Sequence, residues 1–176
     1  MVEIIFEPHS TTLDNENHIS SGHNDVALSE LGVKQSGELG ARRGSETFTA
    51  VFCSDLQRSY KTAAIAFGHK FPIIQDPRLR ECDYGDLTCH PSSEVDAAKP
   101  LHITTPFPHG ESYGQAAVRM GEFLKDLKSK YDGRRVLIIG HRATQYSLEH
   151  WIKGVSVTDA VSAPWTWQPG WTYFLT

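Results

Sequence analysis

The sequence predicts an α/β fold of three layers, in which a mostly parallel sheet carries helices on both faces. Apolar runs of strand length alternate along the chain with segments whose apolar residues recur at helical spacing. Strands covered by helices on both faces are typical of parallel sheets. The 176 residues are 39% hydrophobic, which suits one core, so we expect a single domain over residues 1–176.

The first strand and the first long helix have clear boundaries in the sequence. Residues 2–6 are apolar apart from Glu3 and predict a buried strand. This strand should stop at Pro8, because proline has no N–H to donate to a β-ladder. Ser29 is a favourable N-cap for a helix that we expect to run to about Gly44, since glycine commonly follows a helix end.

A second strand and helix follow directly. Residues 49–52 predict a strand, and Ser54 and Gln57 then have the spacing of a capping box. The helix that they predict ends near Gly68. Residues 71–74 predict a third, short strand.

The second half contains one irregular stretch and four regular elements. Residues 84–110 are rich in proline, histidine and polar side chains, which predicts a loop or a small cap over a site. Residues 111–131 have strong helical spacing. Residues 135–139 predict a buried strand, residues 144–153 a helix, and residues 171–175 a last edge strand.

Composition excludes several classes of function. The formal net charge is −4 without a basic stripe, so nucleic acid is not expected as a partner. Cys53, Cys82 and Cys89 form no CxxC pair, which argues against a disulfide framework or a thiolate zinc site and suits a reducing cytoplasm. No apolar run approaches the ~18 residues of a membrane span. We therefore expect a cytoplasmic protein with no membrane partner, whose oligomeric state the sequence does not reveal.

Three polar clusters lie just beyond predicted strands. They are His9, residues 54–58 and residues 140–142. In open α/β sheets, ligands bind beyond the carboxyl ends of the strands, and parallel strands bring those ends to one edge. The sequence therefore predicts that these clusters meet in one site.

Four residues of this edge are candidates for chemistry, although each type is also common on protein surfaces. His9 and His141 differ from the other histidines because both follow a strand. Arg58 lies in the first helical turn, where a bound phosphate would accept both its guanidinium and the helix amides. Glu81, in a loop, could be a general acid beside a phosphate. The remaining histidines are expected on the surface, with His23 and His109 able to line a substrate mouth: His18, His23, His69, His90, His102, His109 and His150.

Taken together, the segments resemble the histidine phosphatase superfamily, also called the phosphoglycerate-mutase-like family. The similarity extends over roughly residues 2–145 in the order of the family. The segments that carry it are Pro8-His9-Ser10 with Asn15, Gly22 to Gly32, Ser54 to Arg58, Leu79 to Gly85, Pro108-His109-Gly110-Glu111-Ser112, and Gly140-His141-Arg142-Ala143. Each segment is weak alone, and six in register are a strong signal.

The resemblance implies a mechanism without metal or other cofactor. His9 would attack phosphorus and carry the phosphoryl group, while Glu81 would protonate the leaving oxygen and then activate water. Arg58, His141 and Asn15 would hold the phosphoryl oxygens.

The nucleophile motif departs from the family at two positions. Pro8 stands where the family has arginine, and Ser10 where it has glycine. Losing one charged hydrogen bond to an anion costs on the order of 1.5–3 kcal/mol. Arg142, where the family often has glycine, could replace that guanidinium, and Ser10 could add a hydroxyl donor.

The leading hypothesis is a phosphatase for phosphomonoesters of small metabolites, because the short segment 85–108 would admit water. A pseudophosphatase that binds without turnover is an alternative, although Glu81 argues against it, because a pure binder needs no acid. A phosphoglycerate-mutase-type phosphotransferase is another. A histidine metal site is disfavoured because the spacing of His18 and His23 matches no usual zinc pattern. The tryptophans near the C-terminus, Trp165, Trp167 and Trp171, are expected in core packing or a dimer surface, although one of them could line the site.

Overall fold

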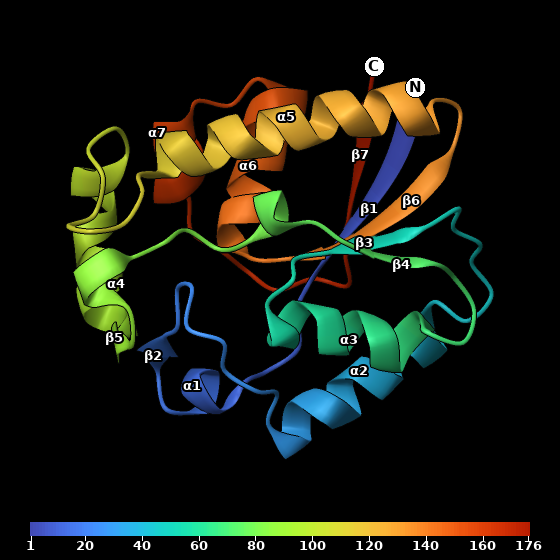
Figure 1. Ribbon diagram of the computed structural model, residues 1–176, viewed down its shortest axis with the longest axis horizontal. Helices are drawn as coiled ribbons and strands as arrows, with labels where there is room; N and C mark the ends of the chain where they lie inside the picture. The colour runs from blue at the N-terminus through green and yellow to red at the C-terminus, as the bar shows by residue number, and fades with distance from the viewer.

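The computed structural model describes residues 1–176 and is organised around a five-stranded sheet of order β4-β3-β6-β1-β7 (Figure 1). Its strands are β1 (Val2–Pro8), β3 (Val51–Cys53), β4 (Ile73–Gln75), β6 (Arg135–Gly140) and β7 (Trp171–Leu175). The first four run parallel, and β7 pairs antiparallel with β1 at one edge. The predicted α/β class with a mostly parallel sheet is therefore confirmed.

Two pairs of helices cover the two faces of the sheet. In Figure 1, α5 (Tyr113–Tyr131) and α6 (Arg142–Lys153) lie above it, and α2 (Glu30–Arg42) and α3 (Gln57–Phe67) lie below. The side chains of β1 alternate between the two cores: Ile4 packs with α5 and α6, and Ile5 packs with α2 and α3. Burial on both faces explains why the strands are almost entirely apolar.

The helix starts agree with the sequence in one case and differ in another. Ser29 caps α2 as predicted, with its hydroxyl accepting from the Gly32 N–H. The predicted capping box at Ser54 is wrong, because Leu56 is the N-cap of α3 and makes no side-chain cap bond. The Ser54 hydroxyl instead lies 2.7 Å from Nε2 of His141. Ser54, directly after β3, therefore makes a contact across the sheet and does not cap the helix.

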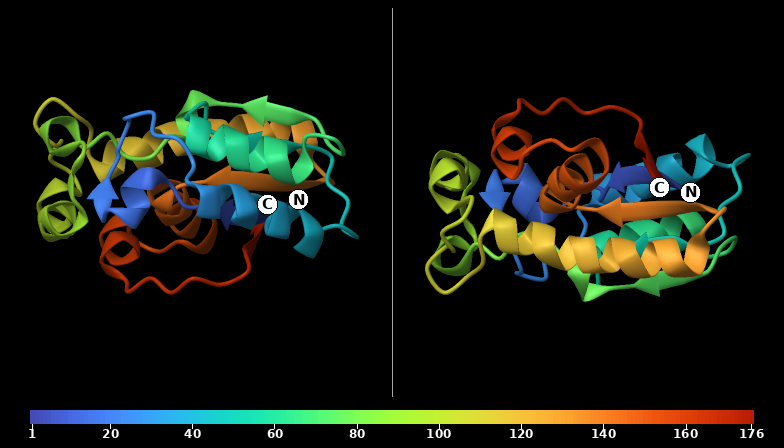
Figure 2. Two further views of the ribbon diagram at one scale, coloured as in Figure 1. Left: turned by 90° about the horizontal axis from the view of Figure 1, so that it is seen from below. Right: turned by 90° about the horizontal axis from the view of Figure 1, so that it is seen from above.

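The region 84–110 forms a small folded cap at one end of the molecule (Figure 2). It contains α4 (Ser92–Ala98), and its short strand β5 (His90–Pro91) pairs with β2 (Ile19–Ser20). The remaining short elements are α1 (Leu13–Glu16), α7 (Val157–Ser162) and the 3₁₀ turns η1 (Pro77–Leu79), η2 (Gly85–Leu87) and η3 (Lys99–His102). A third hydrophobic cluster joins this cap to α7 and the N-terminal turns of α5 and α6.

Between α7 and β7, residues 163–170 run along the side of the molecule without regular structure (Figure 2). This segment returns the chain from the cap end to the edge of the sheet, and it carries Trp165 and Trp167 past the carboxyl ends of the strands. None of the helices combines the length and the apolar character needed to cross a membrane.

Candidate active site

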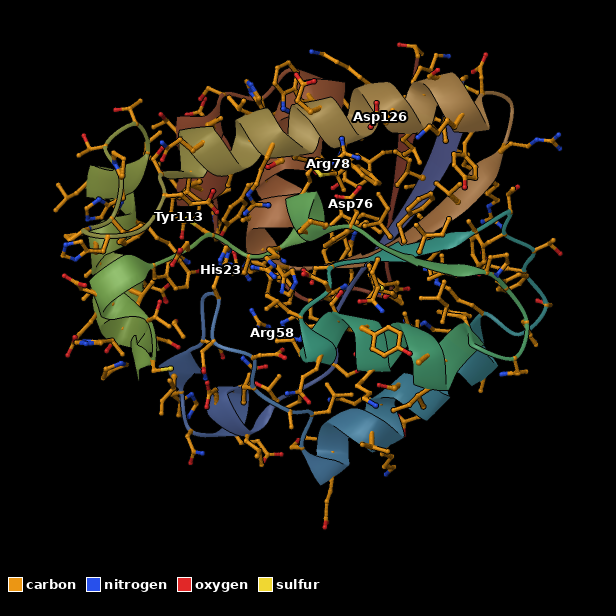
Figure 3. All side chains as sticks on the ribbon, viewed as in Figure 1. His23, Arg58, Asp76, Arg78, Tyr113 and Asp126 are labelled. Atoms are coloured by element: carbon orange, nitrogen blue, oxygen red, sulfur yellow. The ribbon has the colours of Figure 1, made fainter.

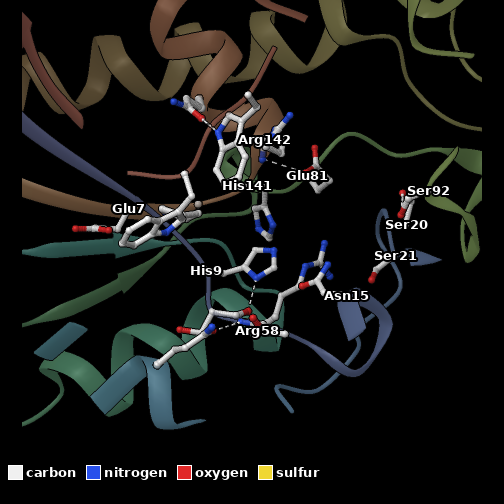
Figure 4. Close-up of a pocket in the computed structure, with 18 of the residues that line it drawn as sticks. Glu7, His9, Asn15, Ser20, Ser21, Arg58, Glu81, Ser92, His141 and Arg142 are labelled. Atoms are coloured by element: carbon white, nitrogen blue, oxygen red, sulfur yellow. Dashed lines mark hydrogen bonds between the residues drawn. The ribbon is translucent and has the colours of Figure 1, made fainter. Parts of the chain in front are cut away.

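The register of the parallel strands brings the three predicted clusters together. Pro8 of β1 pairs with Gly140 of β6, and the next N–H, that of His9, donates to the Gly140 carbonyl at 2.9 Å. The rings of His9 and His141 lie with their centroids 5.0 Å apart (Figure 4). The two imidazoles are therefore placed by the backbone of adjacent strands, as the sequence predicted.

The tautomer of His9 follows from one hydrogen bond. Its Nδ1 lies 2.8 Å from the carbonyl oxygen of Ser10, which can only accept, so Nδ1 carries the proton and Nε2 keeps its lone pair. Burial and the nearby charge of Arg58 lower the pKa of His9 to about 3. His9 is thus a neutral imidazole with a free Nε2 at physiological pH.

His141 is almost completely buried and has one ring nitrogen without a partner. Its Nε2 lies 2.7 Å from Ser54 Oγ. Its Nδ1 is one of only two buried side-chain polar atoms in the protein that make no hydrogen bond. Burial, Arg58 and His9 hold the pKa of His141 well below its usual value. His141 is also the N-cap residue of α6, so this buried nitrogen lies at the start of that helix.

Arg58 supplies a buried positive charge beside the two imidazoles (Figure 4). It is 2% exposed, and its Nη1 and Nη2 donate to the backbone carbonyls of Asn24 and Gly22 at 2.9 and 2.6 Å. No carboxylate forms an ion pair with it. The two carbonyls fix the guanidinium without neutralising it, which leaves its charge for an anion.

Asn15 and Ser10 lie at the same cavity but differ in what they can donate. The Asn15 Oδ1 accepts from the Thr12 N–H, and its amide NH₂ donates to no protein atom. By contrast, the Ser10 N–H donates to Thr62 Oγ1, and the Ser10 hydroxyl lies 2.9 Å from Ser36 Oγ. Asn15 therefore has a donor available to a ligand, whereas both donors of Ser10 are engaged within the protein.

The Glu81 carboxyl is held at the N-terminus of α6. Its oxygens accept from the N–H groups of Cys82, Arg142 and Ala143 at 2.8 to 3.1 Å. His23 lies behind it, with Nε2 2.8 Å from the Glu81 carbonyl. These bonds fix the Glu81 carboxyl at the cavity, and they act through main-chain groups that sequence patterns do not reveal.

Arg142 is placed by aromatic rings and not by a carboxylate. Its guanidinium carbon lies 4.3 Å from the centroid of the Trp165 ring and 5.7 Å from that of Tyr146, whose hydroxyl accepts from Nε at 3.3 Å. Trp165 and Trp167 line the cavity, so the alternative that a tryptophan lines the site describes them better than the preferred expectation of core packing or a dimer surface. The sequence contains a signal for this position, because Trp165 and Trp167 lie between prolines in a segment without helical or strand periodicity.

These side chains surround a cavity of about 710 Å³. This volume is typical of small-molecule sites and far exceeds a single phosphate group. The cap supplies Ser92, Asp96 and Lys99 at one side of the cavity, and the 163–170 segment supplies Trp165 and Trp167. Neither His23 nor His109, which the sequence allowed at a substrate mouth, lines it; His109 is exposed and contacts Asp86.

Nowhere in the chain do three or more His, Cys, Asp or Glu side chains gather as a metal-binding group. The three cysteines are also separate and free.

The sheet topology and the paired imidazoles define an α/β protein of phosphoglycerate-mutase type. The model of the histidine phosphatase superfamily (branch 1) matches residues 4–166. The chain belongs to this superfamily. A probable phosphoglycerate mutase, GpmB of Erwinia tasmaniensis, is 33% identical over 150 residues, which cover 80% of this chain and 70% of that protein. The fructose-2,6-bisphosphatase TIGAR of Xenopus tropicalis is 37% identical over 130 residues, 68% of this chain and 47% of that protein.

Solved structures agree with this assignment. Bacillus stearothermophilus YhfR superposes with a TM-score of 0.84 at 25% identity, covering 96% of this chain and 88% of that one. A mycobacterial glucosyl-3-phosphoglycerate phosphatase in complex with VO3 superposes with a TM-score of 0.78 at 25% identity, covering 92% and 87%. The fold and the family are thus shown, and the relatives include both phosphatases and mutases.

Proposed function

We propose that the protein is a metal-independent phosphatase that hydrolyses phosphomonoesters of small metabolites through a phosphohistidine on His9. The observation that carries this proposal is the pairing of a neutral His9, whose Nε2 makes no hydrogen bond within the protein, with the buried guanidinium of Arg58. A phosphoryl group bound here would meet the His9 Nε2 as nucleophile beside a cation, with the His141 ring centroid 5.0 Å from that of His9. Arg58 and the Asn15 amide would take further phosphoryl oxygens.

In the first step, Nε2 of His9 forms a bond to phosphorus while the bond from phosphorus to the leaving oxygen breaks. Glu81 would deliver a proton to that oxygen, so that the product departs as an alcohol. The Nδ1–H of His9 donates to the Ser10 carbonyl and so stabilises the positive charge that develops on the ring.

In the second step, the Glu81 carboxylate would take a proton from water as the water oxygen attacks phosphorus. The bond between phosphorus and Nε2 then breaks, and inorganic phosphate leaves. The Ser54 hydroxyl, 2.7 Å from Nε2 of His141, would hold this second imidazole beside His9 in both steps. Ser10 contributes least, because its N–H and hydroxyl are already paired.

The size of the cavity supports a small metabolite as the substrate. About 710 Å³ accommodates a leaving group the size of a sugar beside the phosphoryl group. Two relatives are named for hydrolysis of sugar or glyceryl phosphates, a fructose-2,6-bisphosphatase and a glucosyl-3-phosphoglycerate phosphatase. Relatives named as phosphoglycerate mutases keep a phosphotransferase as the second candidate.

The test is hydrolysis of p-nitrophenyl phosphate by the unaltered protein and by His9→Ala, with EDTA present. We expect turnover that survives EDTA and falls by at least about a thousandfold in the variant, since no other group can carry the phosphoryl. Acid-quenched protein should carry labile phosphate only when His9 is present.

Three results would decide against the proposal. Undiminished turnover in His9→Ala would remove the nucleophile assignment. Tight binding of inorganic phosphate without turnover of any phosphomonoester would favour the pseudophosphatase, in which Pro8 has replaced a required arginine. Transfer of phosphate between positions of phosphoglycerate would favour the mutase.

A further inference from the structure

We propose that Trp165 is a positioning residue that holds Arg142 as the second anion-binding guanidinium of the cavity. The inference rests on the proposed function, because it assigns a partner to the phosphate that the site would bind. It concerns a different part of the chain, however, and has its own readout.

The charge balance of the cavity favours Arg142 as a second anion-binding cation. Its cationic side chains are Arg42, Arg58, Lys99 and Arg142. Arg42 forms an ion pair with the buried Glu7, and Lys99 forms one with Asp96. Arg58 and Arg142 form no ion pair.

A phosphomonoester carries close to two negative charges at neutral pH. Two unpaired guanidinium groups match this charge, whereas Arg58 alone would leave about half of it without a cation. Pro8, directly before His9, has no cationic side chain and no N–H to offer. Arg142 is thus the remaining cation able to face the anion.

The rings of Trp165 and Trp171 lie in sequence beside Arg142. The Trp165 ring contacts both the Arg142 guanidinium, 4.3 Å from its centroid, and the Trp171 ring, whose centroid is 6.1 Å away at an interplanar angle of 29°. Trp165 Nε1 donates to Gln145 Oε1 at 2.8 Å, which ties the ring to the same helix that carries Arg142. Trp171 and Gln145 therefore hold the Trp165 ring in place beside the guanidinium.

This arrangement allows Trp165 to orient Arg142 before a ligand binds. A long arginine side chain without an ion pair loses up to about 2 kcal/mol of rotamer entropy when a ligand orders it. A ring that already holds the guanidinium reduces this loss before the anion arrives. Trp171 in β7 anchors the ring, so the edge strand supports the site.

The test compares Trp165→Ala, Trp165→Phe and Arg142→Ala, with Trp151→Ala as the matched control. Trp151 is half-exposed on α6, donates to the Ala117 carbonyl and does not line the cavity. The readouts are the inhibition constant of inorganic phosphate against p-nitrophenyl phosphate, KM and kcat. Where turnover is absent, calorimetric binding of phosphate replaces the first.

We expect Trp165→Ala to raise both the phosphate inhibition constant and KM by about three- to thirtyfold, with kcat changed less. Trp165→Phe should restore most of the affinity, because a phenyl ring can still stack on the guanidinium. Trp165→Ala should add little to Arg142→Ala, because both remove one interaction. Trp151→Ala should stay within twofold of the unaltered protein.

The inference is overturned if Trp165→Ala leaves phosphate affinity within twofold, or if its effect adds fully to that of Arg142→Ala. It is also overturned if a folded Trp165→Phe is as weak as Trp165→Ala, since a stacked ring would then not be what matters. Thermal melting of each variant separates loss of fold from loss of affinity. Failure of the proposed function would show differently, as absent turnover with phosphate binding still dependent on Trp165.

Discussion

Two regions of the cavity are built by different means. The strand-end region, made of His9, Ser54, Arg58 and His141, is held by the register of β1, β3 and β6 and by bonds to backbone carbonyls. The tryptophan segment, residues 163–170, has no regular structure and is held by stacking of Trp165 and Trp167 on Arg142 and Arg42. The first region would carry out the chemistry, and the second would adjust binding.

The difference teaches where precision comes from. A strand register fixes positions to a few tenths of an ångström without dependence on any one side chain, because many ladder bonds share the constraint. A stack depends on one or two rings and contributes about 0.5–2 kcal/mol. Changes at the strand ends should therefore affect turnover most, and changes in the segment should affect affinity.

The largest effect is expected for Glu81→Gln with a poor leaving group. An alkyl phosphate should lose about 10²- to 10⁴-fold in kcat, because its oxygen must be protonated as it leaves. p-Nitrophenyl phosphate should lose much less, since its leaving group needs little protonation. Steady-state rates on the two substrates measure the contrast, and an equal loss on both would contradict the acid role.

The next effect is expected for Arg58→Lys, which keeps the charge and removes the planar fork. Lysine cannot bond to the Asn24 and Gly22 carbonyls and to a phosphoryl group in the same geometry. We expect kcat/KM to fall by about a hundredfold, measured with p-nitrophenyl phosphate.

Arg78→Lys is the matched control for this change. Arg78 forms ion pairs with Asp76 and Asp126 away from the cavity (Figure 3). It should leave kcat/KM within about twofold. A similar loss in both variants would show that the change at Arg58 acts through stability.

The sequence predicted the strand-end region better than the tryptophan segment for a physical reason. His9, Arg58 and His141 follow strands, and strand ends can be located from hydrophobic patterns. The false capping box at Ser54 arose because the same spacing can serve a contact across the sheet, here to His141. Nothing local to Trp165 indicates Arg142, because their contact depends on the path of an irregular segment.

The structure of the cap was also predicted only in part from the sequence. The region 84–110 was predicted only as a loop or small cap, whereas it contains α4 and a strand that pairs with β2. Both paired segments have two residues each, too short to give a periodic signal. The carbonyl that orients His9, that of Ser10, was also beyond prediction, because any residue type could supply it.

A third effect concerns the pH dependence of stability. The pKa of His9 is lowered to about 3, and that of His141 is also lowered, so the unfolded chain binds more protons than the folded one below about pH 6.5. Stability should therefore fall as the pH falls from about 6.5 towards 3. His9→Asn should reduce this dependence by up to about 2 kcal/mol between pH 7 and pH 5. Urea unfolding at both pH values measures it, and an unchanged dependence would argue against a neutral, buried His9.

The smallest effect is expected for Ser54→Ala, which leaves every charged group of the strand-end region in place. Removing the hydroxyl 2.7 Å from Nε2 of His141 takes away the side-chain contact that orients this ring beside His9. If the oriented ring helps to hold the phosphoryl group, kcat/KM should fall by about three- to tenfold. The inhibition constant of inorganic phosphate should rise by a similar factor, because the same ring would contact it. Ser147→Ala, which removes a hydroxyl that donates to the Ala143 carbonyl within α6 and does not line the cavity, is the control for loss of a buried hydroxyl. Equal effects of the two changes would mean that the contact with Ser54 does not orient His141, and His141 would then act only through its position beside His9.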